Sequence, residues 1–85
     1  MNKIEDILKK YNLKYIIDNS ELTPHIKYKI QYDDETLIIV TVIDGKDNFI
    51  YSIFKGKERE YFITDYRPLS LFEHFLEEFK KLKEK

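Results

Sequence analysis

Residues 26–43 read IKYKIQYDDETLIIVTVI, and this stretch decides the fold. In its first part apolar and polar side chains alternate, with the period of a strand buried on one face: Ile26, Tyr28, Ile30 and Tyr32 alternate with Lys27, Lys29 and Gln31. Residues 37–43 are apolar at nearly every position, which is typical of a central strand covered on both faces. The acidic segment between them, residues 33–35, favours a turn, so we expect an antiparallel hairpin.

The segments on either side extend this hairpin into a sheet. Residues 48–55 and 58–66 are rich in Phe, Tyr and Ile, and Gly56-Lys57 separates them, so two further strands joined by a tight turn are predicted. Residues 44–47 form the preceding turn. Residues 13–17 are a candidate first strand, and Pro24 marks the entry of the strand that follows it.

Apolar residues recur at helical spacing near both ends of the chain. In residues 3–11 they are Ile4, Ile7, Leu8 and Tyr11, and after residue 70 they are Phe72, Phe75, Leu76, Phe79 and Leu82. Asn2 with Glu5, and Ser70 with Glu73, have the form of capping boxes that begin two helices. Pro68 is expected to end the last strand.

These elements predict an α+β fold. We expect an antiparallel four- or five-stranded β-meander flanked by an N-terminal helix and a C-terminal helix. The C-terminal helix should pack across one face of the sheet, with the N-terminal helix beside it or on the other side. The 85 residues are expected to form a single domain, because a second core would have too little chain to build it.

The composition excludes several classes of protein. Fifteen Lys and Arg against 16 Asp and Glu leave a net charge of -1, which argues against a dedicated electrostatic DNA binder and against an acidic DNA mimic. The absence of Cys excludes a disulfide scaffold and thiolate chemistry. With no apolar run of membrane-spanning length and no signal-peptide pattern at residues 1–6, we expect a cytoplasmic protein.

Loop lengths predict which side chains share a face of the sheet. If every hairpin closes with an even-numbered loop, the opposed pairs are Ile30 with Leu37, Val42 with Phe49, and Ser52 with Tyr61. One face is then apolar from edge to edge and is the expected seat of the helices: Ile26, Tyr28, Ile30, Leu37, Ile39, Thr41, Ile43, Ile50, Phe54, Tyr61 and Ile63. A loop of different length, or a bulge, would exchange the faces for the strands beyond it.

The second face is the predicted partner-binding surface. An apolar patch of this size is larger than a monomer normally exposes, so the N-terminal helix, a second copy or a partner should bury it. The predicted binding residues are Val40, Val42, Phe49, Tyr51 and Phe62 in the centre, with Lys27 and Lys29 toward the rim. Gln31, Ile38, Ile53, Glu60 and Thr64 complete this face.

The ionisable residues form no recognisable catalytic motif. His74 with Glu77 and Glu78 could offer three metal ligands, but three ligands from one helix are uncommon, so an exposed helix face is favoured. His25, beside Pro24, is favoured as a loop or strand-edge residue. The acidic segments 33–35 and 44–48 lack the calcium-loop pattern and are interpreted as turns, and two glycines cannot build a phosphate loop. We therefore predict no catalytic, metal or cofactor site.

Two functions fit this pattern. We prefer a small non-enzymatic module that binds another protein, or a second copy of itself as a homodimer, through the second sheet face. The lack of Ala and the abundance of Ile and Lys suit AT-rich coding DNA, and small proteins of this kind are frequent among viral and mobile-element accessory proteins that inhibit host machinery. Such a protein would act in the host cytoplasm.

The alternative is single-stranded nucleic-acid binding, with Phe49, Tyr51 and Phe62 stacking bases and Lys27 and Lys29 contacting phosphates. An enzyme would require a deep pocket that places His25 or His74 beside a carboxylate.

Overall fold

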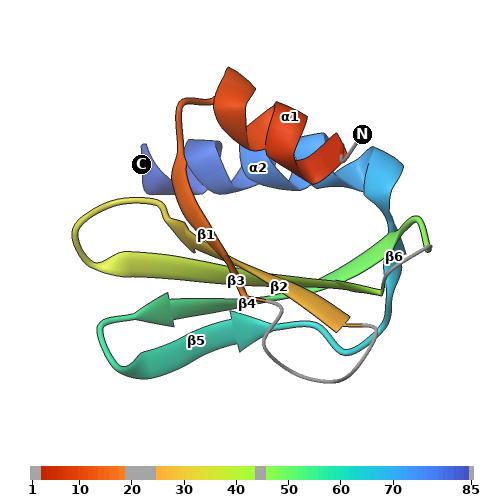
Figure 1. Cartoon of the computed structure of the whole chain (residues 1–85). Helices are drawn as coiled ribbons and strands as arrows, with labels where there is room; N and C mark the ends of the chain where they lie inside the picture. The colour runs from red at the N-terminus through yellow and green to blue at the C-terminus, as the bar shows by residue number, and fades with distance from the viewer. Residues whose placement is uncertain (1–2, 19–24, 44–45, 85) are drawn as a thin grey trace.

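The computed structural model describes residues 3–18, 25–43 and 46–84 (Figure 1). The elements in chain order are helix α1 (Lys3–Lys10), strands β1 (Lys14–Asp18), β2 (His25–Gln31), β3 (Thr36–Ile43), β4 (Asn48–Lys55), β5 (Glu58–Phe62) and β6 (Arg67–Pro68), the 3-10 turn η1 (Leu69–Leu71), and helix α2 (Phe72–Lys83). Four residues named in the predictions lie outside the described residues: Asn2 of the first capping box, Pro24 at the entry of the second strand, and Asp44 and Gly45 of the turn predicted at residues 44–47.

The strands form one antiparallel sheet in the order β1-β2-β3-β4-β5, which confirms the α+β meander. The fifth predicted strand ends earlier than expected, at Phe62. Pro68 does not end that strand but belongs to β6, which pairs with the first residues of β4. Proline is compatible with this short edge segment because it need not donate to a ladder.

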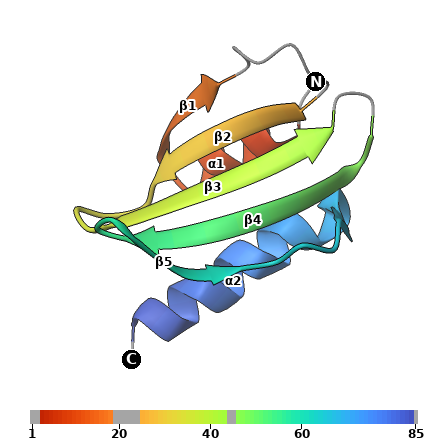
Figure 2. The same ribbon diagram turned by 90° about the horizontal axis from the view of Figure 1, so that it is seen from below.

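Both helices lie on the same side of the sheet (Figure 1). Viewed from the opposite side, α1 lies behind β2 and β3, and α2 lies along β4 and β5 (Figure 2). The structure therefore selects the arrangement in which the N-terminal helix lies beside the C-terminal helix. We call the helix-covered side of the sheet the inner face and the other side the outer face.

The β2–β3 turn sets which residues of β2 share a face with those of β3. The predicted pairing of Ile30 with Leu37 is wrong, because Ile30 pairs with Ile38 and Gln31 pairs with Leu37. The amide of Tyr32 donates to the carbonyl of Thr36 at 3.0 Å, which leaves an odd-numbered loop of residues 33–35. One residue of difference moves every β2 side chain to the other face relative to β3.

Asp33 explains why this turn is odd-numbered. Its Oδ1 accepts hydrogen bonds from the backbone amides of Glu35 at 3.0 Å and Thr36 at 2.8 Å, which closes an Asx-type turn. The prediction that residues 33–35 form a turn is confirmed, while the even loop length assumed for it is wrong.

A bulge changes the register once more, between β4 and β5. Lys55 pairs with Glu58, but Ile53 pairs with Tyr61 and Ser52 with Phe62, because the ladder shifts between Ile53 and Phe54. The predicted pairing of Ser52 with Tyr61 is therefore wrong, and Glu60 is the extra residue. The bulge turns Tyr61 toward the inner face and Phe62 toward the outer face. The pairing of Val42 with Phe49 is confirmed.

The core lies between the inner face and the two helices. The sheet contributes alternate residues that are buried on this face: Tyr28, Ile30, Ile38, Val40, Val42, Phe49 and Ile53. Helix α1 inserts Ile4 and Leu8, and α2 inserts Phe72 and Leu76. Full burial of each such side chain stabilises the fold by roughly 1.5–3 kcal/mol. Strand β3 is thus covered by helices on one face, rather than on both as predicted.

The ends of the helices are stabilised differently from the sequence prediction. Helix α2 begins after η1 with Leu71 at its N-cap, and no side chain caps it, so the predicted capping box of Ser70 and Glu73 does not form. Glu73 instead binds Lys10 of α1. At the end of α1, Asn12 adopts a positive φ of 58°, the left-handed conformation that commonly ends a helix.

Candidate functional site

The centre of the predicted partner-binding surface is buried inside this chain. Val40 and Phe49 are 0% exposed and Val42 is 5% exposed. Phe49 packs edge-on against Phe72 of α2, with the ring centroids 5.4 Å apart. These residues share a face as predicted, but the helices cover that face, so they offer no surface to a partner.

The other predicted residues lie in two different places. Tyr51 is half-buried beside α2, and the centroid of its ring lies 4.1 Å from that of Phe75. Lys27 and Lys29 are on the outer face because of the odd β2–β3 loop, and Phe62 joins them there because of the bulge. The seven predicted binding residues therefore do not form one surface.

Neither helix covers the outer face (Figure 2), which is mainly apolar on strands β3 and β4 and polar on β2. The ladders place the alternate, partly exposed residues of the two central strands on it: Leu37, Ile39, Thr41, Ile43, Ile50, Ser52 and Phe54. Phe62 of β5 lies opposite Ser52 and is 48% exposed. Sequence analysis placed the β3 and β4 residues together correctly but assigned them to the helix-covered side.

Charged side chains lie at the borders of the outer face. At the β1–β2 border, Lys29 Nζ is 3.4 Å from Asp18 Oδ2. At the β5 border, the guanidinium of Arg59 lies over the ring of Phe62, 4.2 Å from its centroid. Exposed pairs of this kind contribute less than about 1 kcal/mol, so the apolar centre dominates what the face can bind.

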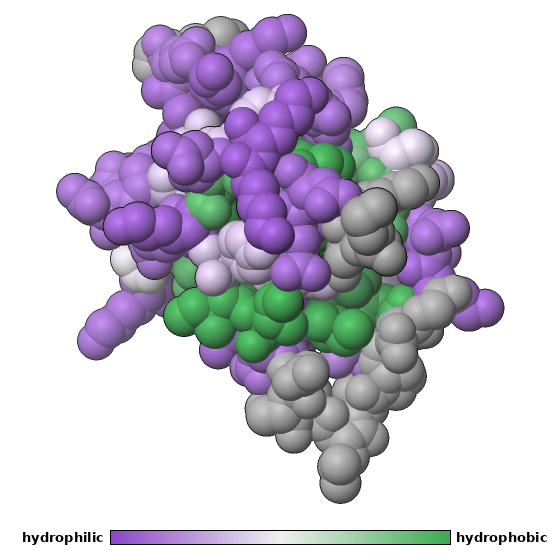
Figure 3. Space-filling model, turned by 45° about the horizontal axis from the view of Figure 1, so that its top comes forward, coloured by the Kyte–Doolittle hydropathy of each residue, from purple (hydrophilic) through white to green (hydrophobic). Residues whose placement is uncertain are grey.

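Hydrophobic side chains also reach the surface at the β1 edge of the sheet. Ile16 and Ile17 are 70% and 41% exposed, and Ile16 pairs with Lys29, which places it on the outer face. Figure 3, in which the helix side comes forward, shows a largely hydrophilic helix surface with a band of hydrophobic residues below it. The polar row of Lys27, Lys29 and Gln31 on β2 separates Ile16 from the apolar residues of β3 on the outer face.

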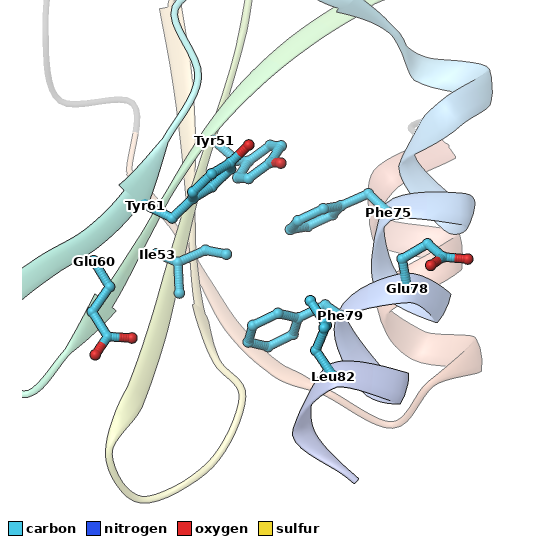
Figure 4. A pocket seen from close by; sticks show the side chains of 8 residues that line it. All are labelled: Tyr51, Ile53, Glu60, Tyr61, Phe75, Glu78, Phe79 and Leu82. Atoms are coloured by element: carbon cyan, nitrogen blue, oxygen red, sulfur yellow. The ribbon is translucent and has the colours of Figure 1, made fainter. Parts of the chain in front are cut away.

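A groove of about 470 Å³ lies between α2 and strands β4 and β5 (Figure 4). Its walls are the rings of Tyr51, Tyr61, Phe75 and Phe79, with Ile53 and Leu82 completing the apolar lining. The carboxylates of Glu60 and Glu78 lie on its two sides. Burial raises the pKa of Tyr51, and the neighbouring Tyr61 adds to this effect, so Tyr51 stays neutral near pH 7.

The groove was not predicted, although the sequence carries a signal for it. Helix α2 has five large apolar residues in its stripe, of which Phe72 and Leu76 are fully enclosed. Phe75 and Phe79 are half-buried and Leu82 is 65% exposed, so they line a partly open space. The bulge at Glu60, which sequence patterns did not indicate, brings Tyr61 to the same space.

The most strongly perturbed ionisable cluster joins the two helices. The hydroxyl of Tyr11 donates to Glu77 and, at 3.1 Å, to Glu73, while Lys10 Nζ lies 2.6 Å from Glu73. The hydrogen bond to Glu77 raises the pKa of Tyr11, with burial as the next cause, and the hydrogen bond from Lys10 lowers the pKa of Glu73. These groups hold α1 against α2, and their function is structural.

The two histidines lie on different elements, His25 at the start of β2 and His74 on α2. His74 is exposed on α2, as the favoured interpretation predicted, and His25 begins β2 at its edge. Glu77 bonds to Tyr11, whereas His74 and Glu78 line one side of a small hollow of about 200 Å³ together with Arg67. Among residues 3–18, 25–43 and 46–84, no group of three or more acidic or histidine side chains could hold a metal ion.

Comparisons with protein families, curated proteins and solved structures found no match for this chain. In the described part of the chain, neither helix has the length and hydrophobicity needed to cross a membrane. Function must therefore be argued from the outer face and the groove themselves.

Proposed function

We propose that the protein is a small non-enzymatic binding module that self-associates by packing its outer sheet face against that of a second copy. The observation that carries this proposal is the position of both helices on the inner face, which leaves the apolar residues of β3 and β4 uncovered. Side chains such as Ile39 and Ile50 carry no acid, base or nucleophilic group. The centre of this face is therefore suited to binding another apolar surface rather than to catalysing a reaction.

A second sheet is the natural complement of this surface. Sheets pack face to face about 10 Å apart, with interdigitating aliphatic side chains and strand directions within about 30° of each other. A second copy supplies an identical aliphatic sheet face at equal concentration, and a twofold axis lets the same patch bind itself. The dimer would have a helix–sheet–sheet–helix order of layers.

The borders of the face are compatible with this pairing. Lys29 is paired with Asp18 within its own chain, and Arg59 lies on Phe62. Arg59 would lie at the rim of the dimer, where solvent and salt screen it. Lys27 and Lys29 lie opposite Thr41 and Ile39, so their long side chains would have to extend toward solvent at the edge of the interface. Strands β3 and β4 themselves bring no charged side chain to the centre of the face, around Ile39 and Ile50.

Single-stranded nucleic-acid binding is the second candidate, supported by one feature of the same face. Phe54 and Phe62 lie on adjacent strands beside Arg59, which gives two rings and a guanidinium that could stack on bases. The remaining centre is aliphatic and offers bases no stacking surface. Self-association is therefore the better-supported function.

The test is the mass of the protein in solution, measured by light scattering across a range of concentrations. The intact chain should approach twice 10.4 kDa as concentration rises. Ile39→Lys, which places a charge at the centre of the outer face, should remain a monomer with an unchanged circular dichroism spectrum.

Leu71→Lys is the matched control. Leu71 is also an exposed apolar residue, at 42%, but it lies in η1 on the helix side of the molecule. This variant should dimerise like the intact chain. A monomeric intact protein at all concentrations, or equal masses for the two variants, would contradict the proposal.

A further inference from the structure

The groove between α2 and the sheet is a second site, independent of the outer face. Four aromatic rings surround it, two from the sheet and two from the helix (Figure 4). Tyr51 stacks with Tyr61 at 5.9 Å between centroids, and Phe75 lies 4.1 Å from Tyr51 and 6.2 Å from Phe79. The rings thus form a connected aromatic wall rather than isolated contacts.

The charged side chains that line the groove are acidic, although Arg67 lies close enough to Tyr51 to act on its pKa from the adjoining hollow. Among the described residues that line it, those charged at neutral pH are Glu60 and Glu78. Glu78 also lies 3.7 Å from Lys81, but both side chains are more than half exposed, so this pair is weak. An anion would meet two carboxylates and the negative faces of the rings, both of which repel it.

We propose that this groove binds an organic cation of the alkylammonium class. The cationic group would lie against the faces of Tyr61 and Phe79, and its apolar body would contact Ile53 and Leu82. Attraction between a cation and an aromatic face is strongest for weakly hydrated quaternary ammonium groups, for which aromatic cages are a recurring solution. The carboxylates of Glu60 and Glu78 add attraction at longer range.

Other ligands fit the same residues less well. A divalent metal ion needs several oxygen ligands that converge, whereas Glu60 and Glu78 lie on opposite sides of the groove and do not point toward each other (Figure 4). A neutral apolar molecule would gain nothing from the two carboxylates. An alkylammonium ion uses the rings, the aliphatic residues and the charge together.

The test compares a matched pair of ligands. Choline and 3,3-dimethylbutan-1-ol have nearly the same shape but differ by one positive charge. In NMR titrations of the full chain, choline should shift the resonances of Tyr61 and Phe79 along a saturable curve. The alcohol should bind at least about tenfold more weakly, since ring and carboxylate attraction together should exceed about 1.4 kcal/mol. Equal affinity for the two ligands would overturn the proposal.

Variants locate the site with a matched control. Glu60 and Glu58 are both exposed carboxylates of β5, but only Glu60 lines the groove. Glu60→Gln should weaken choline binding by about two- to fivefold, whereas Glu58→Gln should leave it nearly unchanged. Tyr61→Leu, which keeps apolar volume but removes an aromatic face, should weaken it by about fivefold.

The same variants distinguish a specific site from diffuse attraction. If Glu58→Gln and Glu60→Gln have equal effects, the cation is held by net charge alone and the proposal is wrong. The same conclusion follows if Tyr61→Leu binds choline as tightly as the intact protein does. Tyr61 is 53% exposed, so this change should leave the fold intact, and circular dichroism checks that.

A free small cation such as choline and a trimethylated lysine side chain both carry a quaternary ammonium group, so both could bind in this groove. Acetyl-trimethyllysine amide brings the four-carbon stem of lysine, which could lie along Ile53 and Leu82. Tighter binding of this probe than of choline identifies a modified side chain as the better ligand, and the reverse order identifies a free cation. Binding of neither probe contradicts the proposal.

Discussion

The ammonium group of Lys83, near the end of α2, lies 3.0 Å from Oδ2 of Asp33 in the β2–β3 turn. The same ammonium donates to Thr36 Oγ1 at 2.8 Å. The last turn of the C-terminal helix is thereby tied to the turn that decides which face of β2 looks toward the helices. The assignment of inner and outer faces depends on Asp33 more than on any other single residue.

Removal of the Asp33 side chain should destabilise the protein. Asp33→Ala deletes two hydrogen bonds to backbone amides and the pairing with Lys83. We expect a loss of about 1–2 kcal/mol in the free energy of unfolding, measured by urea titration. Asp34→Ala, at the exposed neighbouring position, should change it by less than about 0.5 kcal/mol. Equal effects of the two changes would contradict this role of Asp33.

Asp33 should also make stability depend on acid pH. Burial acts to raise its pKa, but the hydrogen bonds from the side chains of Lys83 and Thr36 and from the backbone amide of Glu35 outweigh burial and lower it from 3.8 to about 2. A lowered pKa in the folded state stabilises the protein above pH 3.8, and this contribution is lost as the pH falls through 2. The stability difference between the intact chain and Asp33→Asn should therefore shrink between pH 5 and pH 2. A difference that stays constant over this range would show that the charge of Asp33 does not matter.

Two phenylalanines of neighbouring strands should respond very differently to truncation. Phe49 is fully buried among Phe72, Phe75 and Tyr51, so Phe49→Ala should cost about 3–5 kcal/mol of stability. Phe62 is on the outer face and 48% exposed, so Phe62→Ala should cost the monomer less than about 1 kcal/mol. Chemical denaturation at a concentration where the protein is monomeric measures both. The reverse order would mean that the faces are assigned wrongly.

The contact between the two helices should depend on one hydroxyl group. Tyr11→Phe keeps the ring but removes the donor to Glu73 and Glu77. We expect the free energy of unfolding to fall, because the hydroxyl donor is lost while the ring remains. Tyr66→Phe, at an exposed position in the β5–β6 connection, is the control and should have little effect. No difference between the two variants would show that the hydroxyl does not hold α1 to α2.

Salt should separate the two functions considered for the outer face. Apolar packing of two sheets should be unchanged or strengthened when sodium chloride rises from about 0.05 to 0.5 M, because the border cations are screened. Binding to single-stranded nucleic acid should weaken steeply over the same range. Sedimentation of the protein alone and with an oligonucleotide at both salt concentrations gives the answer. Salt-sensitive oligonucleotide binding by a monomer would favour the second candidate.

Residue periodicity was sufficient to predict the element types. The alternation from Ile26 to Tyr32 and the helical stripe that begins at Phe72 both correspond to observed elements. These patterns are properties of single elements, set by which side chains must leave water. The order of the strands in the sheet could also be predicted, because short turns connect consecutive strands from β2 to β5.

The assignment of faces could not be predicted, because it depends on single residues in two places. An Asx-type turn at Asp33 makes the first loop odd-numbered, and the bulge at Glu60 shifts the last ladder by one. The odd-numbered loop reverses β2 relative to β3, so Val40 and Phe49 lie in the core and not on the predicted surface, while the bulge reverses Tyr61 and Phe62. The groove, which depends on the second of these changes, was missed for the same reason.

The most direct test of the central claim is an isotope-filtered NMR experiment on a mixture of labelled and unlabelled chains. Methyl groups of Ile39 and Ile50 in the labelled chain should show nuclear Overhauser effects to Phe54 and Phe62 ring protons of the unlabelled chain. Ile38, on the inner face and fully buried, should show none. If the intermolecular signals are absent from Ile39 and Ile50, or arise instead from residues of α1 and α2, the outer face is not the surface through which this protein associates.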